Sequence, residues 1–117
     1  MLFLLQYLYD PATQPAEGSP EAQCEFEAWM AFSQEMTDAG VSVAGAPLAP
    51  PETATTLRTT RGQRITTDGP FAETKEVLGG FDLIDVADGD EAMAWAAKVP
   101  GDGIVEVRPA LDLSAMT

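Results

Sequence analysis

The order in which strand-like and helix-like segments follow one another constrains this chain most. Four segments have the apolar alternation or the β-branched composition of strands, namely residues 2–9, 41–48, 79–86 and 103–110. Two segments have helical periodicity, about residues 20–39 and 88–99, and the first is bounded by Ser19-Pro20 and Gly40. This β-α-β-β-α-β order predicts an α+β fold of the ferredoxin-like type, in which both helices cover one face of an antiparallel sheet.

A further hairpin is predicted as an insertion in this core. The stretch "TATTLRTTRGQRITTDG" is dense in β-branched residues, and Arg61-Gly62 is a typical turn, so we expect strands at about 54–60 and 63–67. Asp68-Gly69-Pro70 then breaks the chain direction. Downstream, Gly79-Gly80 predicts a bulge or the close approach of another backbone.

The faces of the predicted elements indicate what should be buried. On the first strand, Phe3, Leu5, Tyr7 and Tyr9 alternate with Leu2, Leu4, Gln6 and Leu8, which is typical of a central strand covered on both sides. The first helix carries a stripe that we expect to face the core, formed by Ala22, Phe26, Trp29, Met30, Ser33 and Met36. On the last strand, Val105 and Val107 should face the helices. Because the opposite face of the sheet also needs a cover, we expect a second subunit there.

Length and charge exclude several classes of protein. The 117 residues predict a single domain, 1–117, and no apolar run is long enough to cross a bilayer. The opening "MLFLLQYLY" lacks the basic flank of a signal peptide, so we expect a cytoplasmic protein without a membrane partner. A net charge of −13 disfavours nucleic-acid binding. These features favour a small cytoplasmic domain whose partners are proteins or small molecules.

The chain contains no histidine and one cysteine, which restricts its chemistry. A Ser-His-Asp or Cys-His arrangement is excluded, as are zinc sites built on histidine or on several cysteines. We therefore expect no metal and no cofactor, and acid–base work would depend on carboxylates, tyrosine, lysine or bound water. Cys24 has no partner for an intrachain disulfide, and we expect it to be a buried or half-buried structural thiol.

One long string of residues resembles a known family. The segment "TDGPFAETKEVLGGFDLIDVADGDEAMAWAAKVP", followed by "VEVRP", closely resembles the DGPF-containing branch of the YCII-related family. The resemblance implies a ferredoxin-like domain that dimerises into an α/β barrel. Some YCII relatives are small enzymes in which a His-Asp pair is implicated, and this chain has no histidine to match it. Members of the DGPF branch often lie beside genes for extracytoplasmic-function sigma factors, and their activity is generally undefined.

Six residues are candidates for a functional site. Asp68 could hold the turn through an Asx-turn hydrogen bond or act as a general base. Tyr7 could be a core residue or donate its hydroxyl to a ligand. Phe71 is expected to anchor in a dimer interface or a cavity wall. The remaining candidates are three charged residues, Arg58, Glu106 and Arg108.

The charged candidates each have two interpretations. Arg58 lies in a window, residues 58–76, that carries about +1, whereas the rest of the chain carries −14. Such a window could receive an anionic group, or its arginines could discourage edge-to-edge aggregation of the hairpin. Glu106 and Arg108 share one strand face and should pair. Their pair could set the register of a dimer or line a ligand cleft.

Three functions are compatible with these residues. The first is a homodimeric small-molecule-binding or accessory protein of undefined activity. The second is a cofactor-independent isomerase or lyase acting by proton transfer on a small anionic or aromatic compound, with Asp68 as base, Tyr7 as donor and Arg108 as anion clamp. The third is a module that binds a sigma factor. The sequence alone does not choose among them.

Overall fold

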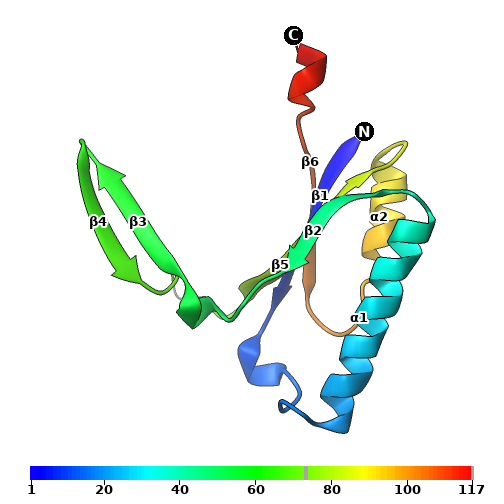
Figure 1. Cartoon of the computed structure of the whole chain (residues 1–117), viewed down its shortest axis with the longest axis horizontal. Coiled ribbons are helices and arrows are strands. Elements are labelled where there is room, and N and C mark those ends of the chain that lie inside the picture. Colours follow the sequence, from blue (N-terminus) through cyan, green and yellow to red (C-terminus); the bar gives the residue numbers. More distant parts are fainter. Residues whose placement is uncertain (73, 117) are drawn as a thin grey trace.

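The computed structural model describes residues 1–72 and 74–116, and its main sheet has four strands (Figure 1). These strands are β1 (Leu2–Tyr9), β2 (Ser42–Pro47), β5 (Val77–Asp85) and β6 (Ile104–Pro109). Their spatial order is β2-β5-β1-β6, and each neighbouring pair is antiparallel. The helices α1 (Pro20–Asp38) and α2 (Gly89–Ala96) cover one face. The predicted α+β ferredoxin-like arrangement is therefore confirmed.

The predicted hairpin is also present, as a separate two-stranded sheet. Strands β3 (Thr55–Thr60) and β4 (Gln63–Asp68) pair in register around the Arg61-Gly62 turn. Both turn residues have positive φ, 53° and 81°, as the favoured two-residue hairpin turn requires. Figure 1 shows this hairpin projecting away from the main sheet and the helices. Below we call β3, its turn and β4 the arm, residues 55–68.

Three short 3₁₀ helices complete the described chain, η1 (Pro11–Thr13), η2 (Pro51–Thr53) and η3 (Leu113–Met116). The third follows β6 near the C-terminal end of the described residues. A local hydrogen bond explains its start, because the backbone N–H of Ser114 donates to Asp112 Oδ1 over 3.1 Å. No helix in the described ranges is long and apolar enough to cross a membrane.

The hydrophobic core lies between the sheet and the helices. Its buried residues come from β1, β5, α1, α2 and the segments next to them, and they include Phe3, Leu5, Phe32, Met36, Ile84, Ala92 and Trp95. Val105 and Val107 pack against this cluster, as predicted. The side chain of Arg108 pairs with Glu106 on the other face, with 2.5 Å between Nη2 and Oε1.

The core stripe predicted for α1 is only partly correct. Phe32 and Met36 are buried, but Phe26 and Met30 are 59% and 57% exposed. The reason is that α1 packs on the sheet through its C-terminal half, while its N-terminal half stands over a hollow. Cys24, in that N-terminal half, is exposed, so the prediction of a buried or half-buried thiol is wrong.

The Gly79-Gly80 pair forms the predicted irregularity in β5. Tyr7 pairs with Gly80 and Leu8 with Leu78, so Gly79 is the extra residue of a bulge. A Cβ atom at Gly79 would lie 2.7 Å from the ring of Tyr9, so any other residue there would force that ring to move. The bulge therefore favours glycine, and it borders the hollow beneath α1.

Candidate functional site

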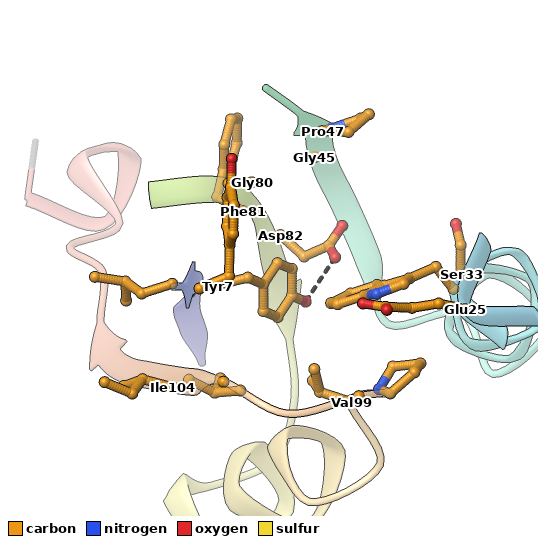
Figure 2. A pocket seen from close by; sticks show the side chains of 18 of the residues that line it. Tyr7, Glu25, Ser33, Gly45, Pro47, Gly80, Phe81, Asp82, Val99 and Ile104 are labelled. Atoms are coloured by element: carbon orange, nitrogen blue, oxygen red, sulfur yellow. Dashed lines mark hydrogen bonds between the residues drawn. The ribbon is translucent and has the colours of Figure 1, made fainter. Parts of the chain in front are cut away.

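The hollow beneath α1 is an open cavity of about 580 Å³ (Figure 2). Its roof is the N-terminal half of α1 and the helical turn that follows, which contribute Glu25, Phe26, Trp29, Met30 and Ser33. Its floor is the sheet, and its far side is the segment between α2 and β6, residues 99–103. A cavity of this size, mostly apolar and with a few polar groups, is typical of a small-molecule site.

Glycines in the neighbouring strands keep the floor of the cavity open. A Cβ atom at Gly45 would lie 2.1 Å from Asp82 Oδ1 and 2.8 Å from the carbonyl oxygen of Phe81. A Cβ atom at Gly80 would lie 3.1 Å from the carbonyl oxygen of Ala46. The absence of a side chain at Gly45 is thus what allows the carboxyl group of Asp82 to turn across β2.

Tyr7 and Asp82 form the polar centre of the floor. The hydroxyl of Tyr7, on β1, donates to Asp82 Oδ2, on β5, over 2.7 Å. Figure 2 shows the two side chains pointing toward each other beneath α1. Tyr7 is buried and Asp82 is half-buried. The pair therefore links two adjacent strands inside a largely apolar cavity.

Burial changes the acidity of both groups. Desolvation, followed by the hydrogen bond to Asp82 and its negative charge, raises the pKa of Tyr7 far above the usual value. Tyr7 therefore stays protonated and remains a donor. Burial also raises the pKa of Asp82, while the hydrogen bond from Tyr7 opposes that rise by favouring the carboxylate. Raised carboxyl pKa values inside cavities are common at functional sites.

An aromatic wall stands against this pair. The ring of Trp29 meets the ring of Tyr7 edge-on, with 4.9 Å between centroids and 65° between planes. Trp29 contacts Phe32 in the same manner, and Phe32 contacts Trp95. This row connects the cavity to the core, so the position of Tyr7 is fixed by packing as well as by its hydrogen bond.

The cavity is acidic. Glu25, Asp82 and Asp102 line it, and among its described lining residues there is no lysine or arginine. Glu25 lies close to the segment after α2, since a Cβ atom at Gly101 would be 3.1 Å from Glu25 Oε1. These carboxyl groups favour a ligand that carries hydrogen-bond donors or positive charge. The described residues contain no group of three or more His, Cys, Asp or Glu side chains arranged to hold a metal ion.

The six sequence-derived candidates do not meet at one place. Tyr7 lines the cavity on the helix side of the sheet. Arg58 and Asp68 lie on the exposed arm, and Phe71 is exposed in the loop that follows it. Glu106 and Arg108 pair on the face of the sheet that the helices leave open. Of these candidates, only Tyr7 is among the residues that line the cavity.

Sequence reasoning missed Asp82, the partner of Tyr7. One signal could have revealed it: Asp82 alternates with Phe81 and Leu83 and so shares a strand face with Ile84, which is fully buried. A carboxylate on the core-facing side of a strand needs a partner or a cavity. Glu25 gives no comparable signal, because acidic residues are spread over much of α1.

The fold and this cavity define a class: an α+β ferredoxin-like domain with a polar pair beneath its first helix. The chain belongs to the YCII-related family, whose model matches residues 1–114. It is similar to an uncharacterized protein, R00369, of Rhizobium meliloti (strain 1021). The two are 38% identical over 113 residues, which cover 93% of this chain and 91% of that relative.

Proposed function

We propose that this protein is a homodimer that binds a small organic molecule in the cavity beneath α1. The observation that carries the proposal is the Tyr7–Asp82 pair, held 2.7 Å apart in an otherwise largely apolar cavity. A flat apolar body would lie against Trp29 and Met30. Its polar group would be an amine, amide or hydroxyl that donates to Asp82, because the carboxyl groups around it repel an anion.

A thermal-shift screen of small metabolites tests this proposal. Neutral or cationic aromatic compounds should raise the melting temperature by mass action, whereas matched carboxylates should not. Asp82→Asn should weaken binding of an active compound, because an uncharged amide attracts a donor less strongly. Asp68→Asn, outside the cavity, is the matched control and should bind normally. Equal binding by both variants would contradict the proposed site.

The open face of the main sheet supports the homodimer. Leu2, Leu4 and Leu8 on β1 alternate with the buried residues, so they lie on the side away from the helices. Their strand partners Leu83, Leu78 and Ile104 share that side. Ile104 is 49% exposed in the single chain. A second copy would cover this apolar face, and an apolar sheet face of this kind is rarely left to water.

The charged pair on this face fits a two-fold contact. Glu106 and Arg108 of one copy would meet the same pair of the other in the opposite direction, so each charge gains an opposite neighbour. The pair would then fix the register of the two sheets. We also propose that Phe71, which is exposed beside the arm, anchors in the second copy.

The string "DGPFAETKE" supports assignment to the DGPF branch, and on that resemblance we propose a cytoplasmic role as an accessory to an extracytoplasmic-function sigma factor. Co-purification of the tagged protein with a sigma factor at low salt tests this role. Retention should fall as salt rises, because the net charge of −13 would contribute to binding. A lack of retention at low salt would contradict it.

A second candidate function is proton transfer, and the raised pKa of Asp82 favours it. A half-buried carboxylate is a stronger base than an exposed one, and Tyr7 stays protonated beside it as a donor. A bound compound with an acidic C–H group should then exchange that hydrogen for deuterium in heavy water. Loss of exchange in Asp82→Asn, measured at a compound concentration that saturates the variant, would separate catalysis from binding. Equal exchange with and without the protein would contradict this function.

A further inference from the structure

We propose that the arm, residues 55–68, clasps a second copy of this chain, with its arginines lying against that copy's acidic surface. The inference rests on the proposed homodimer and adds a second contact region to it. Figure 1 shows the arm extending away from the body of its own chain. The described chain measures 50 × 45 × 18 Å, a flat shape to which the arm contributes.

The arm lacks cover from its own chain. Of its residues, Thr56 is half-buried and all the others are exposed. Leu57 and Ile65, which are 58% and 61% exposed, lie on opposite faces, because Leu57 pairs with Thr66 and Ile65 with Arg58. An isolated two-stranded hairpin is marginally stable in water. A partner that covers both faces would therefore stabilise the strands.

The charge of the arm is opposite in sign to that of the rest of the chain, which we call the body. The chain carries −13 in total and the arm carries +2, from three arginines and Asp68, which leaves −15 on the rest. Arg58, Arg61 and Arg64 have no ion-pair partner within 4.0 Å among the described residues. The arm is thus a basic projection on a strongly acidic protein, and a surface of complementary charge attracts it.

The backbone at the root of the arm is restricted by flanking prolines and by a hydrogen bond between its two sides. Pro50 and Pro51 precede it and Pro70 follows it, and each proline restricts the backbone. The two sides of the root are joined by a hydrogen bond from the Gly69 N–H to the carbonyl oxygen of Ala54, over 2.6 Å. Restriction at the root lowers the conformational entropy that docking of the arm would cost.

These observations favour a second copy of this chain as the binding partner of the arm. It carries the same −15 body, and the two-fold contact through the open sheet face would bring it within reach. Nucleic acid would also attract arginines, but it would meet the repulsion of the whole acidic body. The charges and the shape of the chain therefore favour a contact between the arm of one copy and the body of the other, repeated twice in the dimer.

Matched charge reversals test the proposal. Arg58→Glu/Arg64→Glu changes the arm, and Lys75→Glu/Lys98→Glu makes the same change of charge outside it. Sedimentation velocity should show that the arm variant weakens dimerisation by about tenfold more than the control, equivalent to about 1.4 kcal/mol. Raising salt from about 50 mM to 500 mM should weaken the wild-type dimer relative to the arm variant. Both dimers gain from screening of the repulsion between the two acidic bodies, but only the wild type also loses the attraction of its arm.

The results for these variants distinguish the arm contact from the sheet-face dimer. Equal effects of the two double variants would overturn the arm contact while leaving the homodimer intact. A wild-type chain that is monomeric at all concentrations would overturn both. If Ile104→Asp dissociates the dimer and the arm variant does not weaken it, the arm contact is overturned and the sheet-face dimer is retained.

Cross-linking adds a direct readout. A photoreactive residue at position 61, in a mixture of isotope-labelled and unlabelled chains, should give cross-links between copies on acidic segments of the body. Cross-links within one copy alone would overturn the proposal. So would a gel shift in which the arm variant loses binding to nucleic acid but keeps the wild-type dimer.

Discussion

The carboxyl group of Asp82 is half-buried beneath α1, and it accepts a hydrogen bond from the hydroxyl of Tyr7. Burial raises the pKa of Asp82 and the hydrogen bond from Tyr7 lowers it, with burial the larger effect. The folded protein therefore holds a proton on Asp82 more tightly than the unfolded chain does. The sign of this shift means that Asp82 reduces stability as pH rises from its unfolded pKa through its folded pKa.

Burial and the hydrogen bond from Tyr7 shift the pKa of Asp82 in opposite directions, so removing the Tyr7 hydroxyl should have a predictable effect. In Tyr7→Phe the lowering influence disappears, so the pKa of Asp82 should rise further above its ordinary value. A titration of the Asp82 carboxyl carbon by NMR measures the change directly. Tyr9→Phe is the control, since Tyr9 lines the same cavity, and it should leave the titration unchanged. A lower pKa in Tyr7→Phe would contradict the assignment of the donor.

Gly45 gives a second prediction for a single residue. Gly45→Ala would place a methyl group against Asp82 Oδ1 and the Phe81 carbonyl oxygen, so the carboxyl group must move or the strands must separate. The expected cost is about 1–3 kcal/mol in the free energy of unfolding. Urea denaturation measures it. Gly89→Ala is the control, because its nearest contact would be an ordinary 3.8 Å to the ring of Phe3.

At the scale of elements, α1 differs along its length. Its C-terminal half buries Phe32 and Met36 in the core, and its N-terminal half presents Phe26, Trp29 and Met30 to the cavity. Helical periodicity predicted an apolar face over both halves. It could not distinguish them, because a side chain that packs in a core and one that lines a cavity have the same spacing in the sequence.

The two halves of α1 should therefore respond differently to truncation. Phe32→Ala should reduce the free energy of unfolding by about 3–5 kcal/mol, because it empties a packed site. Phe26→Ala should cost no more than about 1 kcal/mol, since the side chain is already exposed. Urea denaturation of both variants measures the difference. Similar losses in both would mean that the N-terminal half of α1 packs as tightly as the C-terminal half.

At the scale of the whole molecule, the open sheet face and the arm are the two surfaces without cover in the described chain. Ile104→Asp would place a charge on the apolar face of the proposed sheet interface, so the variant should be a folded monomer. Sedimentation gives the mass, and circular dichroism checks the fold. Met93→Asp, on the exposed side of α2, should leave the mass unchanged. A dimeric Ile104→Asp variant would place the interface elsewhere.

The sequence by itself determined the elements of this protein, their order and the Arg61-Gly62 hairpin. Alternation, helical spacing, caps and turn residues are local patterns, and each acts on neighbours a few positions apart. Tertiary structure alone decided that Tyr7 would meet Asp82, 75 positions away, and that half of α1 would cover a cavity. Such contacts depend on strand register, on the bulge at Gly79 and on the bare backbone at Gly45, which act together only once the chain has folded.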